Sequence, residues 1–280
     1  MKDKNIQMID IYGTPFIDIF CKSNTDVSER NSVFESNIST EIGGIGNVYR
    51  FIDDSQINFI FLVANDFNKY CDLDDKNISF INFHGRQPKA VIFENMKIKE
   101  RLSYVDQGNI PRLAPTKIQK NSIFYYIEQI PFKIINNGNH FIFSEFNSNP
   151  SFENREIVSH NINTTTHFFF SIEEKSELEN FISIHADLNK LYSKIFIGHS
   201  PSRSIIYKYS TENGKATLVK DIVIKNQWFS PDVYMPTGKG DIFSFHLAKS
   251  IVANLQIEKS LEQAQKFTIE NIKRLIHKKF

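Results

Sequence analysis

The chain has 280 residues, with 33 lysine and arginine residues against 32 aspartate and glutamate residues, so its formal net charge at pH 7 is +1. This length allows one large α/β domain or two small ones. The balanced charge argues against a general nucleic-acid-binding protein, and the two cysteines, Cys21 and Cys71, are too few for a disulfide framework or a Cys-x-x-Cys metal site.

The N-terminal residues and the apolar runs indicate the cellular location of the protein. Residues 1–10 lack the apolar core of a signal peptide. The longest apolar runs, such as Phe59–Ala64, are too short to span a membrane. The sequence therefore predicts a cytoplasmic protein that is not held in a membrane.

Buried strands separated by polar turns are expected in the first half of the chain. Aliphatic and aromatic runs predict strands over 6–12, 57–64, 78–83, 89–94 and 101–105. The polar stretch 22–40 suits a flap or a strand of a small accessory sheet. Gly43, Gly44 and Gly46 precede a run typical of a helix and so predict a turn at its start. A nicotinamide site is not expected there, because Tyr49 replaces the third glycine of the dinucleotide fingerprint.

The second half alternates strands with helices. Strands are expected over 123–127, 139–145, 161–170 and 194–198, and a hairpin over 205–209 and 216–224. A helix follows Ser171, and a last helix covers 260–280. This alternation predicts an α/β domain with a mostly parallel sheet.

A glycine turn followed by a helix stands out near the C-terminus. Gly238 and Gly240 lie just before the apolar face of a helix over 242–252. Free N–H groups and the dipole make a helix N-terminus an anion site. Asp241 beside that site would repel a phosphate but could act as general base for a hydroxyl attacking the phosphate. The alternative is that Asp241 only caps the helix.

Residues 235–243, Met-Pro-Thr-Gly-Lys-Gly-Asp-Ile-Phe, resemble the C-terminal signature of the ribokinase-like (PfkB) carbohydrate kinases, usually written D-T-x-G-A-G-D-x-F. Both glycines, the last Asp and the Phe match. Lys239 replaces the usual Ala, and Met235 stands at the first Asp. The Gly43-Gly44 pair followed closely by Asn47 is similar to the N-terminal signature of the same family.

This resemblance implies a single ribokinase-like three-layer α/β domain over residues 1–280. Its mostly parallel central sheet would be flanked by helices, and a small β lid would come from about 14–40 and 82–110. The implied activity is the ATP-dependent phosphorylation, with Mg²⁺, of a hydroxyl of a sugar, a sugar derivative or a nucleoside. The implied partners are this small-molecule substrate and a second copy bound through the lid, with no nucleic acid and no membrane.

The resemblance also assigns roles to individual residues. Asp241 would be the general base, and the anion hole would be formed by Gly238, Lys239 and Gly240. The residues that would hold the substrate are Asp18, Gly43, Gly44, Asn47 and Arg101. Those that would contact the nucleotide are Thr237, Gly198 and Arg203. Glu174, in a segment similar to the family's Asn-x-x-Glu, would place Mg²⁺.

Each of these assignments has a structural alternative. Asp18 could be a polar residue on the outer face of a strand, and Arg101 an edge-strand charge. Glu174 could simply favour the dipole of its helix, and Arg203 could be a surface charge. The pair Gly43-Gly44 could be a plain turn.

The chain also departs from the family pattern at three supporting positions, Met235, Phe196 and Ser171. These replace residues that the family uses at the nucleotide, metal or monovalent-cation site. A second hypothesis is therefore a catalytically weak or inactive relative that binds a sugar, a nucleotide or a protein partner.

Overall fold

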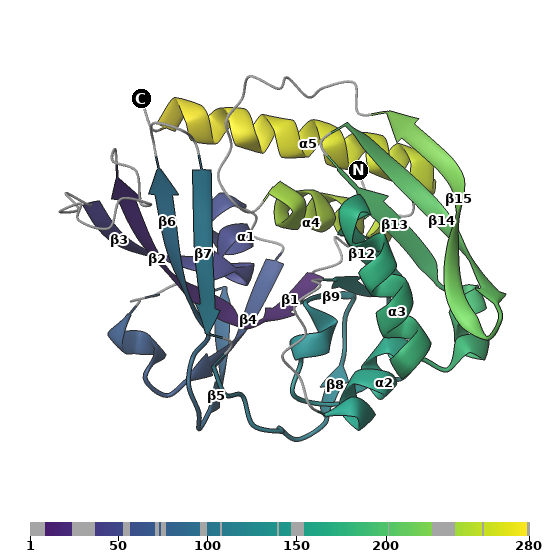
Figure 1. Cartoon of the computed structure of the whole chain (residues 1–280), viewed down its shortest axis with the longest axis horizontal. Helices are drawn as coiled ribbons and strands as arrows, with labels where there is room; N and C mark the ends of the chain where they lie inside the picture. The colour runs from purple at the N-terminus through teal and green to yellow at the C-terminus, as the bar shows by residue number, and fades with distance from the viewer. Residues whose placement is uncertain are drawn as a thin grey trace, which may run out of the picture.

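The structure of the chain is a computed structural model. It describes residues 9–23, 37–52, 57–70, 73, 77–95, 100–106, 108–138, 140–146, 154–200, 202–225, 239–253 and 255–278. Three groups of elements are visible: a large central sheet, helices packed on it, and a small sheet (Figure 1). Within the described residues, no helix combines the length and the apolar character needed to cross a membrane.

The central sheet has nine strands in the order β15-β14-β13-β12-β11-β9-β1-β4-β5. In chain order they are β1 Ile9–Gly13, β4 Ile57–Ala64, β5 Ile78–Phe83, β9 Ser122–Tyr125, β11 Ile142–Glu145, β12 His167–Ser171, β13 Ile195–His199, β14 Arg203–Glu212 and β15 Lys215–Lys225. Neighbouring strands run parallel from β5 to β13, and only the pairs β13–β14 and β14–β15 are antiparallel. The predicted mostly parallel sheet is confirmed.

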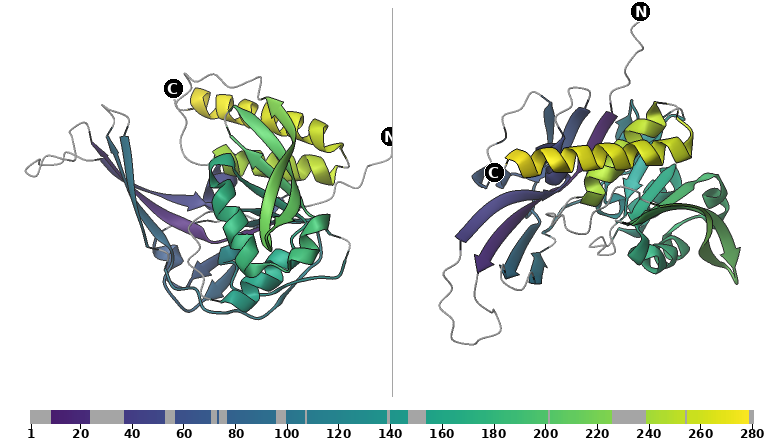
Figure 2. Two further views of the ribbon diagram at one scale, coloured as in Figure 1. Left: turned by 45° about the vertical axis from the view of Figure 1, so that its right-hand side comes forward. Right: turned by 90° about the horizontal axis from the view of Figure 1, so that it is seen from above.

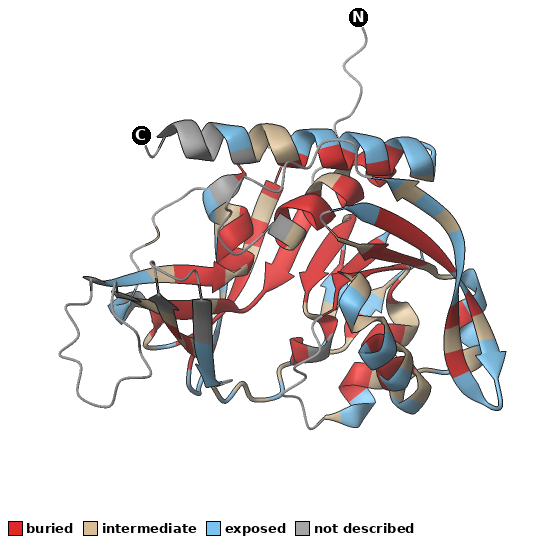
Figure 3. Cartoon of the chain, turned by 45° about the horizontal axis from the view of Figure 1, so that its top comes forward, coloured by how far each residue is buried: buried red, intermediate tan, exposed pale blue. Residues whose placement is uncertain are grey.

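Helices cover both faces of this sheet, because each face carries its own apolar core. One core joins the sheet to α1 Ile45–Phe51, α4 Lys239–Val252 and α5 Ile257–Lys278. The other joins it to α2 Arg155–Thr164 and α3 Lys175–His185. Figure 3 shows the buried residues along the central strands and α4, whereas α5 alternates buried and exposed patches. The result is the three-layer α/β arrangement that was expected.

The small sheet has four strands in the order β3-β2-β6-β7. They are β2 Pro15–Ser23, β3 Asn37–Gly44, β6 Lys89–Asn95 and β7 Glu100–Asp106. The pairs β2–β3 and β6–β7 are antiparallel, and β2–β6 is parallel. Figure 2 shows this sheet projecting from the body of the molecule. Residues 82–83, which the sequence analysis placed in the lid, belong to β5 of the central sheet. The assignment of the small sheet as a lid remains a prediction.

Helix α2 differs most from the sequence-based prediction, which gave a strand over residues 161–170. Asn154 caps the helix, with its side chain accepting from the backbone N of Ile157 at 3.3 Å. Asn161, fully buried, donates to the carbonyl of Phe132 and accepts from the N–H of Ile134, each at 2.9 Å. These bonds join α2 to the short sheet of β8 Thr116–Ile118 and β10 Ile134–Asn136.

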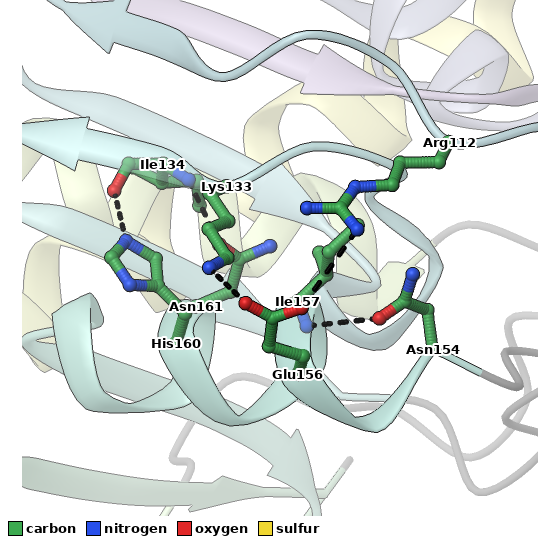
Figure 4. Close-up of polar contacts among 8 residues, drawn as sticks. All are labelled: Arg112, Lys133, Ile134, Asn154, Glu156, Ile157, His160 and Asn161. Carbon is green, nitrogen blue, oxygen red and sulfur yellow. Dashed lines mark hydrogen bonds and ion pairs between the residues drawn. The ribbon is translucent and has the colours of Figure 1, made fainter.

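Charged contacts add to this junction on its outer side. Glu156 of α2 forms ion pairs with Lys133 and Arg112, and His160 contacts the carbonyl of Ile134 at 2.8 Å (Figure 4). Because all these groups are already paired within the fold, the cluster has a structural role.

Candidate active site

Asp241 lies in the first turn of α4 and is buried there. The apolar residues that follow it turn into the core, as the pattern over 242–252 predicted. Two other elements fix the position of this turn. The hydroxyl of Tyr125, at the end of β9, donates to the backbone carbonyl of Asp241 at 2.6 Å, and the side chain of Asn47 in α1 hydrogen-bonds the Asp241 carboxylate. The carboxylate therefore has a defined place where β9, α1 and α4 meet.

The surroundings of Asp241 favour its protonated form. Burial and then the nearby charge of Glu145 raise its pKa, with a smaller contribution from Asp18. The hydrogen bond from Asn47 and the His199 ring act in the opposite direction, and the resulting pKa is about 7. A carboxylate with a pKa near neutrality accepts and releases a proton efficiently at that pH. A pKa of about 7 is what the predicted general base would need, and the role itself remains a prediction.

Glu145 is a second buried carboxylate, at the end of β11. One of its oxygens accepts from the hydroxyl of Ser244 in α4, and the other lies 2.9 Å from Nε2 of His199 at the end of β13. Burial acts to lower the pKa of His199, but the charge of Glu145, the hydrogen bond to it, and the charges of Asp241 and Glu174 together raise that pKa. These carboxylates therefore favour the protonated, cationic form of the ring.

The small sheet brings a third carboxylate to the same place. Asp18 in β2 is buried, and its Oδ2 lies 2.0 Å from the position that a Cβ would take at Gly43 in β3. Only glycine at position 43 leaves room for this carboxylate. Gly44 ends β3 with a φ of +59°, in the left-handed region, and caps α1, which carries Asn47. Asn47 hydrogen-bonds the Asp241 carboxylate and the charge of Asp18 acts on it, so these two side chains lie near Asp241. Their roles, and those of Gly43 and Gly44, remain predictions.

Other predicted site residues are placed less directly. Arg101 is in β7, at an edge of the small sheet. Arg203 is exposed at the start of β14. Gly198 is buried in β13, where a Cβ would meet the Tyr207 ring at 2.9 Å. Glu174 is half-buried at the N-cap of α3.

Part of the C-terminal signature lies outside the described residues. These positions are Met235, Thr237 and Gly238, and Lys239 is described only as the first residue of α4. The roles assigned to these residues remain predictions: Arg101, Gly198, Arg203, Glu174, Thr237, Gly238 and Lys239.

His199, Ser244, Tyr125 and Glu145 were not among the predicted site residues. Three of these four end a parallel strand of the central sheet. Ligands of open α/β sheets bind outside the carboxyl ends of the strands, so polar residues at strand ends were the available signal.

The described residues contain no group of three or more histidine, cysteine, aspartate or glutamate side chains that could hold a metal ion. Magnesium, however, is usually bound by one or two carboxylates together with water and substrate phosphates. A single carboxylate such as Glu174 fits that mode of binding.

Comparisons place this arrangement among known folds. No protein-family model matches the sequence, and no curated protein matches it. Solved structures do match. The nucleoside kinase of Methanocaldococcus jannaschii, an archaeal member of the ribokinase family, has a TM-score of 0.60 at 15% identity over 96% of this chain and 98% of that chain. The chain has a ribokinase-like fold.

Two further kinases share it. Arabidopsis thaliana ribokinase, solved with ribose and ATP, has a TM-score of 0.59 at 13% identity over 92% of this chain and 90% of its own. Anopheles gambiae adenosine kinase has a TM-score of 0.59 at 10% identity over 95% of this chain and 96% of its own. At these identities the likeness establishes the ribokinase-like fold, and the chemistry has to be argued from the site.

Proposed function

We propose that the protein is an ATP-dependent phosphotransferase that phosphorylates a hydroxyl of a sugar, a sugar derivative or a nucleoside. One observation carries this proposal. Asp241 is a buried carboxylate with a pKa of about 7 at a helix N-terminus, and Asp18 and Asn47 lie beside it. A base of that pKa next to an anion site, with hydroxyl-binding groups at hand, suits phosphoryl transfer to a hydroxyl.

The proposed reaction uses the residues as follows. Asp241 takes the proton of the substrate hydroxyl while the hydroxyl oxygen forms its bond to the γ-phosphorus and the bond from that phosphorus to the β–γ bridging oxygen breaks. The backbone amides of 238–240 stabilise the charge on the transferred group, as N–H donors at a helix start do. Lys239 adds a positive charge.

Substrate hydroxyls are held by Asp18 and Asn47, which together offer acceptors and a donor. The glycines at 43 and 44 allow close approach of the backbone. Arg101 reaches the substrate from the small sheet.

The nucleotide is contacted by Thr237, Gly198 and Arg203. Glu174 would hold Mg²⁺ together with water and phosphate oxygens, and the ion would neutralise phosphate charge.

Two neighbouring structures support the substrate class. Arabidopsis thaliana ribokinase was solved with ribose and ATP, and Burkholderia thailandensis nucleoside kinase, with a TM-score of 0.53 and 11% identity, was solved with inosine.

We also propose a homodimer through the small sheet, since apolar residues are exposed on it, among them Ile38, Tyr104 and Val105. Size-exclusion chromatography with light scattering tests this: a mass of twice the chain supports it, and a monomer at all concentrations contradicts it.

One observation favours the second candidate, a protein that binds such a ligand without turning it over. Phe196 stands where the family uses a threonine near the nucleotide, and its ring is fully buried and stacked on Phe168 with centroids 5.1 Å apart. This position therefore supplies core packing and no polar contact.

The first experiment measures ADP release from Mg-ATP in the presence of a panel of sugars and nucleosides, with thermal shifts for the same ligands. Turnover with one acceptor, together with stabilisation by that acceptor and by ATP, supports the kinase. Stabilisation by a sugar or nucleoside without turnover favours the binding protein. No response to any nucleotide contradicts the proposed phosphotransferase.

A further inference from the structure

The ring of His199 lies over the first turn of α4. A Cβ built on Gly240 would come within 3.1 Å of Cε1 and 3.8 Å of Nε2 of that ring. The ring also packs against Phe243, with ring centroids 5.4 Å apart. Gly240 therefore leaves the ring room to approach α4 closely, since a Cβ at 240 would require the ring to move by a few tenths of an ångström.

The two nitrogens of this ring differ in their surroundings. Nε2 is 2.9 Å from the Glu145 carboxylate. Nδ1 has no hydrogen-bond partner among the residues that the structure describes, and the side chain is 13% exposed. A histidine that carries both protons has two donors, so one N–H holds Glu145 and the other is available to a ligand.

We propose that His199 binds the terminal phosphate of the nucleotide through Nδ1 while Nε2 holds Glu145. This inference deepens the proposed function and rests on it. It adds a side-chain donor to the backbone amides at the start of α4, from a residue that the sequence comparison with the kinase signature does not assign.

The charges around the ring support this assignment. The acidic groups that act on His199 are Glu145, Asp241 and Glu174. These carboxylates would repel a polyphosphate, so an anion can approach Asp241 only where positive charge compensates them. The same carboxylates favour the charged form of the His199 ring, and a charged donor binds a phosphate oxygen more strongly than a neutral one.

Two substitutions separate the two nitrogens. In His199→Gln the amide nitrogen replaces Nε2, which keeps a donor to Glu145 but removes the charge and the Nδ1 donor. In His199→Asn the amide nitrogen replaces Nδ1, but the contact with Glu145 is lost. His246→Gln is the matched control, because His246 is also on α4 but contacts Asn271 of α5 at 2.7 Å.

The test measures the dissociation constants of ATP, ADP and inorganic tripolyphosphate by calorimetry, together with kcat and KM. We expect His199→Gln to weaken tripolyphosphate and ATP binding about tenfold or more, the size of a lost charge-assisted hydrogen bond. We expect KM for the acceptor hydroxyl substrate to stay within about twofold, and His246→Gln to match the wild type.

The outcomes separate this inference from the proposed function. If His199→Gln binds tripolyphosphate and ATP like the wild type while the wild type phosphorylates an acceptor, only the role of His199 is wrong. The role of His199 is also wrong if only His199→Asn weakens tripolyphosphate and ATP binding, since His199 then acts only through its hydrogen bond to Glu145. If the wild type binds neither ATP, ADP nor tripolyphosphate, both proposals fail.

A measurement on the wild-type protein tests the same inference if the variants do not fold. In wild-type protein with isotope-labelled histidines, tripolyphosphate should shift the side-chain nitrogen resonances of one ring while leaving those of His246 in place. Binding of tripolyphosphate without any shift of a histidine resonance would overturn the inference.

Discussion

Replacing Asp241 by Asn should stabilise the protein above neutral pH while abolishing turnover. The environment raises the pKa of Asp241 from its ordinary 3.8 to about 7. At about 1.4 kcal/mol per pH unit, holding the ionised carboxylate in the fold costs at most about 4 kcal/mol. Asn has the same shape and no charge, and its carbonyl oxygen still accepts the hydrogen bond from Asn47.

The sign of the pH dependence follows from this shift. Below pH 3.8 the carboxyl is protonated in both the folded and the unfolded chain, so it costs nothing. Between about pH 4 and 7 the unfolded chain loses its proton first, and the wild type loses stability as pH rises. Above pH 7 the full cost is present. The advantage of the Asn variant should therefore grow from pH 4 to 7 and then level off.

The assay is thermal unfolding of both proteins from pH 4 to pH 9. A chain of this size gains about 2 °C per kcal/mol, so the difference in Tm should approach about 8 °C above pH 7. Asp221→Asn is the control: Asp221 forms an exposed ion pair with Lys208, and its loss should change Tm by no more than about 2 °C. Equal Tm values for wild type and Asp241→Asn at pH 8 would show that the ionised Asp241 carboxylate does not lower the free energy of unfolding.

The same variant tests the chemistry. Loss of a general base should lower kcat by about 100-fold or more, with KM for ATP little changed. A variant that keeps the wild-type kcat would show that Asp241 only caps α4.

Three further predictions address the neighbours of this carboxylate and the fold. Gly43→Ala would put a methyl group 2.0 Å from Oδ2 of Asp18, so the carboxylate must move, and KM for the acceptor hydroxyl substrate should rise about tenfold; an unchanged KM would contradict the role of Asp18. Glu145→Gln removes a charge that raises the pKa of Asp241, so the acid limb of the pH profile of kcat/KM should move to lower pH, and an upward move would contradict this coupling. Asn161→Ala removes two buried hydrogen bonds and should cost about 2–4 kcal/mol in urea unfolding without changing KM; a cost near zero would show that water replaces the side chain.

The sequence predicted those elements whose signal is local. The run Ile57–Ala64 is apolar enough to be a buried strand whatever surrounds it, and it is β4. The turn Glu212-Asn213-Gly214 predicted a hairpin, and there Asn213 and Gly214 adopt φ values of +50° and +75°. The roles of Asp18, Asn47 and Asp241 came from the resemblance to the two family signatures and remain predictions.

Helix α2 was missed because its composition hides its periodicity. The helix is largely polar, and the β-branched threonines that follow it favour a strand. Its buried positions are Ile157, Val158, Asn161 and Ile162, a spacing that fits one face of a helix. A buried asparagine does not count as apolar in such a pattern, although Asn161 makes the hydrogen bonds that join α2 to Phe132 and Ile134.

The pairing of Glu145 with His199 could not be predicted from local sequence. The two residues are 54 positions apart, and they meet because β11 and β13 lie on either side of β12 in a parallel sheet, so both end at the same edge. Strand order of this kind depends on the whole fold and not on the residues between them.

In the proposed phosphoryl transfer, different groups around Asp241 would meet the two substrates. On the side of the small sheet lie Asp18 and Asn47, which suit a neutral ligand with hydroxyl donors and repel one that already carries phosphate. On the side of β13 lie His199 and the N-terminus of α4, which suit an anion. Burial raises the pKa of Asp241 to about 7, the value that the proposed general base would need near neutral pH. A protein that only bound sugars would need hydroxyl-binding groups such as Asp18 and Asn47. Sugar binding alone requires neither the His199 ring nor a buried carboxylate such as Asp241.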